Sequence, residues 1–379
     1  MERVAIIGVG QTKYERQKTE DSFADLVYEA TTKAMADAEI TIEEIDNVVT
    51  ISNDFWDGRT ISSMAVMDAA GAANKNASTV EGDGTFGALY GLMRILSGSY
   101  RTTLVVAHSK SSMGSLPIIT NSMFDPIYYR SVGLDGISSA GLQARRYMDK
   151  YLVTEEDCAL VSIKNHHNAK ANPYAQLATE LTVEDVMSSR ALAEPIKLWD
   201  ASPISDGAAA IILACENRAK KSAKKPAWVK GVGYCADAYY LGDRDLAEMD
   251  ALSTAAKKAY SMAGITEPFK EIDVVELYDA FSYQELMWME GLGFCDRGKA
   301  AKLVQEGVTQ RQGSLAVNPS GGVLSAHPVL TAGLARLAET ALQLRGEAEE
   351  RQVEGAKTAL AHGMNGSCGQ GHCVWVLSQ

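Results

Sequence analysis

The sequence predicts an α/β fold, a duplicated arrangement of five layers, α-β-α-β-α, with an inserted loop domain. The first observation is a repeat: TTKAMADAEITIEEIDNVV at 31–49 matches AKKAYSMAGITEPFKEIDVV at 256–275 in pattern. The second is that each copy follows a strand-like segment with spaced glycines, VAIIGVG at 4–10 and AWVKGVGY at 227–234. The third is the alternation of strands with Ala-rich helices, which indicates sheets covered by helices on both faces. Such a repeat is typical of two fused structural units.

The remaining elements follow in the same order in both halves. In the first half, a Gly-rich turn at 84 leads into a helix that ends near 96, and GSYRTTLVVAHS at 98–109 is a buried strand. In the second half, NPSGGVLSAHPVL leads into the helix TAGLARLAETALQLRG at 331–346, and KTALAHGMNGS at 357–367 is the matching strand and loop. Each half is therefore expected to run strand, helix, strand, turn, helix, strand.

Domain organisation follows from this repeat. The first half is expected to comprise residues 1–115 together with 200–224, because SPISDGAAAIILACENRAKK at 202–221 has the pattern of one more of its strands. Residues 116–199, richer in Tyr, Asn, Met and Pro, form the inserted loop domain, and 225–379 form the second half. An insertion of this length above a rigid core is a usual place for substrate-binding loops.

Composition argues against two classes of function. The net charge is −12 without a basic block, so the clustered cations that nucleic-acid binding needs are missing. No segment approaches the ~18 uninterrupted apolar residues of a membrane-spanning helix. The start, MERVAIIGVGQ, lacks the pattern of a secretory signal, and the six scattered cysteines do not suggest a disulfide framework. We therefore expect a cytoplasmic protein that binds neither nucleic acid nor a membrane.

Five stretches in a fixed order carry a resemblance to a known family. They are IKNHHNAKANPYAQ at 163–176, SPISDGAAAIILA at 202–214, IDVVELYDAFSYQELMWMEGLGFC at 272–295, NPSGGVLSAHPVLTAGLARLAETALQLRG at 318–346 and GMNGSCGQG at 363–371. Together they resemble thiolases, in the branch that includes sterol-carrier-protein-type thiolases and thiolase-like aldolases. The resemblance covers nearly the whole chain.

The resemblance implies four catalytic loops that meet where the two halves abut. The first normally offers a cysteine at a helix start, where the helix dipole lowers the thiol pKa and backbone N–H groups bind an oxyanion. Here that stretch is VEGDGTFGAL, the cysteine slot falls on Gly84, and the first cysteine of the chain is Cys158. An acyl-cysteine at this position is excluded. We expect a wider pocket there, suited to a bulky or branched acyl group.

The second and third loops carry candidate acid–base groups. The second has Tyr278 where the family usually has Asn or His, and a phenol can donate to a carbonyl or move a proton. This form resembles the thiolase-like aldolases. The third holds His327 in Ser-Ala-His-Pro, where it could polarise a thioester oxygen or deprotonate coenzyme A. The alternatives are structural: a turn cap for His327 and a buried aromatic for Tyr278.

The fourth loop is the last one, GMNGSCGQG. The resemblance implies an acid–base cysteine near this point, and spacing puts its slot at Asn365. Cys368, three residues later, is the expected reactive thiol, with inert packing as the alternative. Asn365 and Gly369 are expected to shape the active-site and oxyanion loops. No zinc site is expected, because adjacent His372 and Cys373 would point to opposite faces of a strand.

Three further residues are candidates for coenzyme A binding or for the pocket wall. His166 lies in an apparent helix of the insertion, and a solvated face is the alternative to a place near coenzyme A. Ser325 and Asp279 are neighbours of His327 and Tyr278 in their loops. We expect no metal and no tightly bound cofactor, with coenzyme A as a co-substrate.

The leading functional hypothesis is thiolytic cleavage of a bulky 3-oxoacyl-coenzyme A, aromatic ones included. Tyr278 and His327 would hold the carbonyls, with Cys368 or coenzyme A itself as the thiol. Among family members this is similar to benzoylsuccinyl-coenzyme A thiolase. The alternatives are retro-aldol cleavage of a 3-hydroxyacyl-coenzyme A and a non-catalytic acyl-coenzyme A binding subunit. The resemblance also implies a homodimer and a small partner made of a zinc ribbon and an OB fold.

Overall fold

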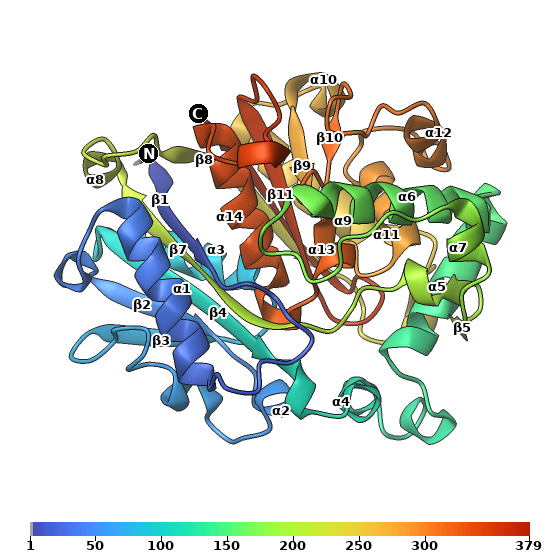
Figure 1. The fold of residues 1–379 in the computed structure, drawn as a ribbon, viewed down its shortest axis with the longest axis horizontal. Helices are drawn as coiled ribbons and strands as arrows, with labels where there is room; N and C mark the ends of the chain where they lie inside the picture. The colour runs from blue at the N-terminus through green and yellow to red at the C-terminus, as the bar shows by residue number, and fades with distance from the viewer. Residues whose placement is uncertain (1–2) are drawn as a thin grey trace.

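The computed structural model describes residues 3–379 (Figure 1). Its large sheet has ten strands in two groups of five. The first group consists of β1 (Val4–Gln11), β2 (Asn47–Ile51), β3 (Asn76–Val80), β4 (Thr102–Lys110) and β7 (Asp206–Cys215). The second consists of β8 (Ala227–Ala236), β9 (Val274–Glu276), β10 (Ala316–Val317), β11 (Thr358–Asn365) and β12 (Gly371–Ser378).

Both groups have the same topology. The first runs β1-β7-β4-β2-β3, with β2 parallel to β3 and β4 and the other pairs antiparallel. The second runs β8-β12-β11-β9-β10 and repeats these directions pair by pair. β1 and β8 pair antiparallel at Ala5–Trp228 and Ile6–Ala227, which joins all ten strands. The predicted duplicated α/β fold class is confirmed.

Helices cover the strands on both sides. α1 (Phe23–Ala38) packs on the outer face of the first group, and α9 (Asp250–Ala263) packs on the outer face of the second. α3 (Gly84–Leu96) and α14 (Ala332–Arg345) contact each other between the two groups. Buried side chains accordingly form three large clusters, one at each outer face and one in the centre.

The strands contribute to two clusters at once because successive side chains point to opposite faces. In β4, Leu104 and Val106 belong to the cluster under α1, whereas Val105 and Ala107 belong to the central cluster. Strands buried on both faces contain continuous apolar runs, such as LVVA in β4 and AAAIILAC in β7. The helix layers therefore follow from the residue pattern of the strands.

Spaced glycines set the distance between each outer helix and its first strand. A Cβ added at Gly10 in β1 would collide with the Ala30 carbonyl oxygen of α1. A Cβ added at Gly233 in β8 would collide with the Ala255 carbonyl oxygen of α9. The repeat seen in the sequence is thus a repeat of one close helix–strand packing.

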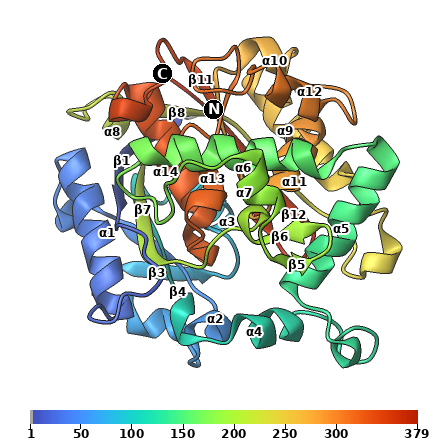
Figure 2. The ribbon, with the colours of Figure 1, turned by 45° about the vertical axis from the view of Figure 1, so that its right-hand side comes forward.

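The segment between β4 and β7 covers one end of the molecule, coloured from teal through green to yellow-green in Figure 1. In Figure 2 its helix α6 crosses in front of α13, and α6 contacts α11, α12 and α13. The predicted boundaries of this inserted domain, 116–199, remain a prediction. Its elements are α4 (Leu116–Ser122), α5 (Gly136–Tyr151), α6 (Glu155–Asn168), α7 (Val183–Met187), β5 (Ala191–Ala193) and β6 (Ile196–Lys197). The other short helices are α2 (Asp54–Asp57), α8 (Glu216–Ala219), α10 (Pro268–Glu271), α11 (Ser282–Gly291), α12 (Ala300–Gln305) and α13 (Gly322–Ser325).

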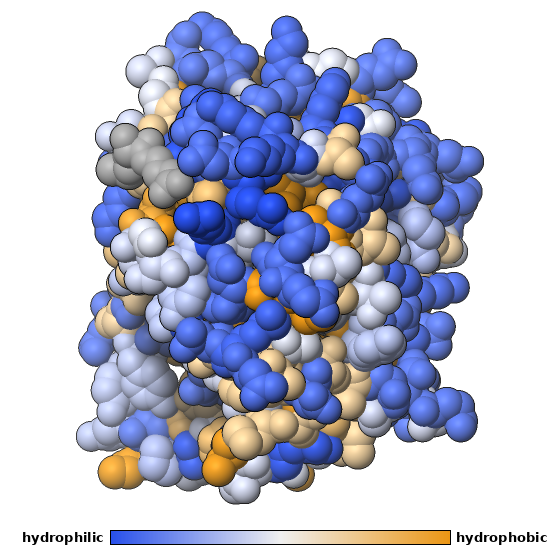
Figure 3. All heavy atoms as spheres, turned by 90° about the vertical axis from the view of Figure 1, so that its left-hand side faces the viewer, coloured by the Kyte–Doolittle hydropathy of each residue, from blue (hydrophilic) through white to orange (hydrophobic). Residues whose placement is uncertain are grey.

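The surface on the side of the first half is largely hydrophilic, with apolar residues along its lower edge (Figure 3). Over residues 3–379, no helix combines the length and apolar character needed to cross a membrane.

Candidate active site

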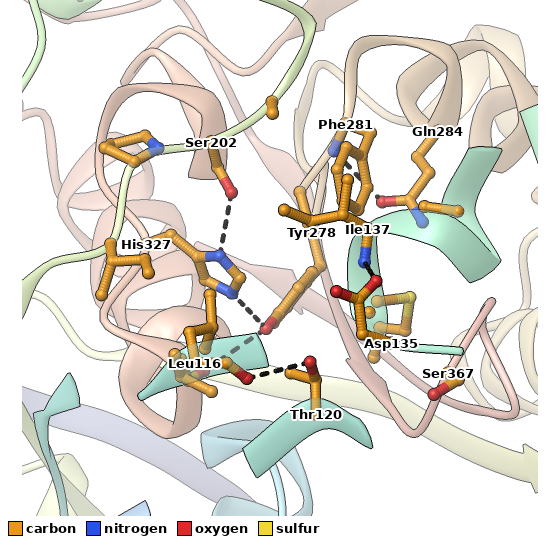
Figure 4. Close-up of a pocket in the computed structure, with 18 of the residues that line it drawn as sticks. Leu116, Thr120, Asp135, Ile137, Ser202, Tyr278, Phe281, Gln284, His327 and Ser367 are labelled. Atoms are coloured by element: carbon orange, nitrogen blue, oxygen red, sulfur yellow. Dashed lines mark hydrogen bonds between the residues drawn. The ribbon is translucent and has the colours of Figure 1, made fainter. Parts of the chain in front are cut away.

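A cavity of about 440 Å³ lies where loops of the two halves meet the inserted segment (Figure 4). Most of its wall is apolar and includes several large side chains: Trp56, Leu116, Met123, Ile137, Leu177, Trp199, Phe281, Leu330 and Met364. The polar groups of the wall are fewer: Asp83, Thr120, Asp135, Ser202, Tyr278, Gln284, His327, Asn365, Ser367 and Cys368. An apolar pocket with few convergent polar groups is typical of a small-molecule site.

Three side chains in this wall form a hydrogen-bonded chain (Figure 4). The Tyr278 hydroxyl lies 2.7 Å from His327 Nε2, and Ser202 Oγ lies 2.9 Å from His327 Nδ1. A neutral imidazole has one acceptor and one donor nitrogen. The arrangement fits a ring that accepts from Tyr278 at Nε2 and donates to Ser202 from Nδ1.

Burial fixes the protonation of this chain at neutral pH. It lowers the pKa of His327 to about 4, because the charged imidazolium loses its hydration. Burial raises the pKa of Tyr278 well above its usual value of 10, and the negative charge of Asp83 raises it further. Tyr278 is therefore a neutral proton donor and His327 a neutral acceptor.

Neighbouring groups hold these two residues in place. The Asp279 carboxylate accepts hydrogen bonds from the Val323 N–H (2.6 Å) and from Asn165 Nδ2 (2.7 Å). This ties the loop after β9, which carries Tyr278, to α13 and α6. The His327 N–H donates to Ser205 Oγ (2.9 Å), and its carbonyl accepts from the Ser205 N–H (3.1 Å).

Asp83 is a buried carboxylate in the cavity wall, only 3% exposed. It caps the N-terminus of α3, where it accepts from the Thr85 N–H (3.0 Å) and Thr85 Oγ1 (2.6 Å). Its other oxygen accepts from the Gly333 N–H at the start of α14 (2.7 Å). Burial outweighs these hydrogen bonds and raises the pKa of Asp83 to about 6.

Two buried histidines link the Tyr278 loop to the last loop. The Tyr278 N–H donates to His362 Nδ1 (3.4 Å), and His362 Nε2 lies 2.9 Å from His372 Nδ1. His372 in turn bonds to the backbone of Gly369. Trp288 packs edge-on against both rings and donates to the Tyr278 carbonyl (2.9 Å). Each histidine therefore accepts at Nδ1 and donates from Nε2.

Cys368 reaches the cavity, but its thiol is not paired with a base. Its Sγ donates to the Ser139 carbonyl (3.2 Å), and burial raises the pKa of this thiol to about 11. A protonated thiol is a weak nucleophile. Cys368, the predicted reactive thiol, therefore has no neighbouring base among residues 3–379 that could remove its proton.

Comparison with known proteins agrees with this architecture. Residues 4–217 match the family model "Thiolase, N-terminal domain", and residues 233–379 match "Thiolase C-terminal domain-like". An acetyl-CoA acetyltransferase of Methanothermobacter thermautotrophicus is 36% identical, over 97% of this chain and 98% of that protein. The chain belongs to the thiolase family.

Other relatives place this thiolase in the branch with sterol carrier protein 2. The rabbit (Oryctolagus cuniculus) protein of that name is 34% identical over 96% of this chain and 70% of its own length. Benzoylsuccinyl-CoA thiolase subunit BbsB of Thauera aromatica is 35% identical over 60% of this chain and 59% of its own. The solved Ltp2-ChsH2(DUF35) aldolase shares the fold, with a TM-score of 0.84 at 24% identity, over 99% of this chain and 97% of that chain.

Gly84, the position at which the resemblance puts the cysteine, does not open into extra space. Gly84 is buried, and a Cβ there would lie 2.5 Å from Leu334 Cβ and 2.7 Å from the Leu334 backbone nitrogen. Gly84 is also absent from the cavity wall, which Asp83 enters instead. The expected widening at Gly84 is therefore wrong, because α14 fills the space.

The other predicted residues divide between the cavity wall and the shell behind it. Tyr278, His327, Cys368 and Asn365 line the cavity. Gly369 lies behind it against Trp288 and His372, with φ +64°. The remaining three are buried outside the wall: Ser325, Asp279 and His166.

His166 was predicted to face coenzyme A or the pocket, but it is buried outside the cavity wall. The side chain is fully buried, so neither the predicted place near coenzyme A nor the solvated face is found. Its ring packs edge-on against Trp199, a residue of the cavity wall. Burial lowers its pKa to about 4. It supports the wall from behind.

Sequence reasoning missed Asp83, Ser202 and Trp199. Ser202 opens the stretch SPISDGAAAIILA, and Asp83 precedes the glycine at the cysteine slot, so both lay within recognised motifs. Trp199 had no motif to mark it. Between residues 3 and 379 there is no group of three or more His, Cys, Asp or Glu side chains placed to hold a metal.

Proposed function

We propose that this thiolase cleaves the C2–C3 bond of a bulky 3-oxoacyl-coenzyme A by thiolysis, with the thiol of coenzyme A as the direct nucleophile. The family gives the general thiolase reaction class. One observation supports the specific proposal: the cavity presents a neutral Tyr278–His327 pair, whereas its one thiol, Cys368, is protonated and bonded away from any base. The nucleophile then has to come from the co-substrate.

His327 and Tyr278 would divide the proton chemistry. On binding, a substrate carbonyl oxygen takes the Tyr278 hydrogen bond, which leaves His327 Nε2 open to the coenzyme A thiol. The sulfur attacks C3 as its proton passes to Nε2, and the electron pair of the C2–C3 bond enters the thioester as an enolate. A donor placed at such an oxyanion contributes about 2.7–4 kcal/mol. Ser202 stabilises the imidazolium from the Nδ1 side.

The cavity wall supports a bulky acyl group, aromatic ones included. Trp56, Trp199 and Phe281 face it together with aliphatic side chains. Aromatic walls stack on flat apolar groups with favourable edge-to-face or offset geometry. Coenzyme A is proposed as a co-substrate, without a tightly bound cofactor.

We also propose that the chain works in an assembly. A relative is named as a subunit, which supports a second component. The expected assembly is a homodimer that binds a small zinc-ribbon and OB-fold partner. Native mass spectrometry of the complex, isolated from the organism that makes it, measures the number of copies of this chain and the mass of any partner subunit. The cytoplasmic location remains a prediction.

Retro-aldol cleavage is the second candidate, favoured by the proton donor Tyr278 and by the missing activated thiol. In this reaction His327 takes the proton of a 3-hydroxyl group, and the same C2–C3 bond breaks to give an aldehyde or ketone. Coenzyme A is then not consumed.

Product analysis distinguishes the two candidates. The protein is incubated with 3-oxo-3-phenylpropanoyl-coenzyme A and coenzyme A, and products are quantified by mass spectrometry. Thiolysis gives one benzoyl- and one acetyl-coenzyme A for each coenzyme A consumed. Reaction only with 3-hydroxy-3-phenylpropanoyl-coenzyme A, giving benzaldehyde and acetyl-coenzyme A, would establish the second candidate. An acyl group found on Cys368 would contradict direct attack.

A further inference from the structure

The cleavage proposed above leaves an enolate that needs a proton at C2, and no residue has yet been assigned to supply it. The group must reach the cavity, be able to take up and release a proton near neutral pH and lie close to Tyr278, which holds the enolate oxygen. Cys368 reaches the cavity, but its thiol donates to the Ser139 carbonyl and has no base to exchange protons with.

Asp83 meets these geometric conditions. Asp83 belongs to the cavity wall beside the start of α3, the place where the thiolase resemblance puts the cysteine. It is close enough to Tyr278 for its charge to act on that phenol. The Asp83 oxygens are reached by donors from both halves of the molecule, Thr85 and Gly333.

Two glycines pack directly against the Asp83 carboxylate. A Cβ added at Gly333 or at Gly363 would overlap the Asp83 carboxylate. Both glycines therefore make room for this side chain, one from the start of α14 and one from β11. Asp83 is thus a buried acid that contacts the starts of two helices, packs against two glycines and belongs to the cavity wall. These contacts fix its position.

We propose that Asp83 is a catalytic residue of this thiolase, the acid–base group that delivers a proton to C2 of the enolate and removes it in the reverse direction. The inference rests on the proposed cleavage and names the proton carrier that this cleavage requires. Asp83 directly precedes Gly84, the position where the resemblance puts the cysteine. Unlike that cysteine, Asp83 would transfer a proton and would not carry an acyl group.

The proton and electron balance closes over one turnover. The coenzyme A sulfur loses its proton to His327 and forms the new bond to C3. The C2–C3 electron pair becomes the enolate, and C2 takes the proton of the Asp83 carboxylic acid, which leaves a carboxylate. His327 then loses its proton to water and Asp83 regains one from water, so one proton leaves sulfur and one reaches carbon.

Proton exchange at C2 measures this step without cleavage. The protein is incubated in D₂O with acetyl-, butanoyl- and 3-phenylpropanoyl-coenzyme A, and deuterium at C2 is followed by NMR. We expect the wild-type protein to exchange at least one of these thioesters and Asp83→Asn to slow that exchange about 100-fold or more. Cys368→Ala, the rival proton carrier, is expected to retain it.

The pH dependence of the wild-type protein gives a second measurement that does not depend on a variant folding. Removal of a C2 proton needs the carboxylate form, so exchange should fall as the pH drops through about 6, the pKa that burial gives Asp83. Far-UV circular dichroism at each pH verifies that the fold persists. The residual exchange of Asp83→Asn should lack this decline.

The outcomes separate the two proposals. Wild-type exchange that persists in Asp83→Asn, or disappears in Cys368→Ala alone, overturns the role of Asp83 and leaves the cleavage reaction standing. A wild-type protein that exchanges none of the three thioesters and cleaves neither phenyl substrate overturns the proposed function itself. Slow exchange in Asp83→Asn together with the lost pH dependence supports the assignment.

Discussion

The two halves of this thiolase have one scaffold and two different sets of loops. Asp46, before β2, accepts N–H bonds from Arg101 (2.6 Å) and Thr102 (3.0 Å). Asp273, before β9, accepts the equivalent bonds from Lys357 (2.8 Å) and Thr358 (3.0 Å). These contacts are repeated because they hold strands together.

The loops at the other ends of the strands differ. After β2, Asn53 caps α2 with its side chain; after β9, the corresponding place is taken by the loop of Tyr278. The loop before α3 is short and ends at Asp83, whereas the loop before α14 contains α13 and His327. The two copies share the packing of their strands and helices. The candidate catalytic side chains lie on the loops in which the copies differ.

The largest effect is expected from the second-half loops. Tyr278→Phe removes only the hydroxyl that donates to His327 and should lower kcat about 100-fold or more, in the range of general acid–base catalysis. His327→Gln can still form hydrogen bonds but cannot take up a proton, so this variant should lower kcat by a similar factor. Steady-state kinetics on the cleaved substrate measures both. Full activity in Tyr278→Phe would show that the Tyr278 hydroxyl takes no part in the reaction.

The scaffold should respond alike in both halves. Gly10→Ala and Gly233→Ala each push a methyl group into a helix carbonyl oxygen, and overpacking of this kind costs about 1–3 kcal/mol. Gly242→Ala is the control, because its Cβ would have only Tyr129 Oη nearby, at 3.8 Å. Urea unfolding gives the three free energies. A loss in only one of the two test variants would show that the copies are not equivalent.

A smaller effect is expected at the contact between the segment just before β7, which carries Ser202, and the His327 loop of the second half. Ser202→Ala removes one hydrogen bond to His327, worth about 0.5–1.5 kcal/mol, which corresponds to roughly 2–10-fold in kcat. Ser202→Thr keeps the hydroxyl and serves as the matched variant. A loss above about 100-fold in Ser202→Ala, with Ser202→Thr active, would make Ser202 a proton carrier.

The smallest effect is expected at Cys368. Since its thiol is protonated and donates to Ser139, Cys368→Ala should change kcat less than about threefold, within the loss of one weak hydrogen bond. A fall of tenfold or more would restore Cys368 to the chemistry and would favour an acyl-enzyme over direct attack.

The sequence was most informative where a motif fixes the backbone. The repeat predicted the layers, and the Tyr-Asp-Ala-Phe and Ser-Ala-His-Pro motifs predicted two side chains that the structure places 2.7 Å apart. Their direct hydrogen bond could not be predicted, because it depends on how loops from β9 and β10 pack.

Burial was the property that the sequence could not supply. His166 and Asp279 have the chemistry of site residues, but both are buried outside the cavity wall. Asp279 is held by Asn165 of α6 and Val323 of α13, and His166, on α6 itself, packs against Trp199. Asp83 was overlooked because a carboxylate before a helix ordinarily serves only as a cap. Its place in the cavity follows from glycines of α14 and β11, far away in the sequence.

The paired rings of His362 and His372 make the molecule sensitive to acid. Both imidazoles are held neutral, with pKa values lowered by burial, to about 3 for His372 and well below 6.5 for His362. Their unfolded counterparts take up protons near pH 6.5, so each histidine should lower the free energy of unfolding as the pH falls below that value. Acidification would thus loosen the support of Tyr278 and the last loop together.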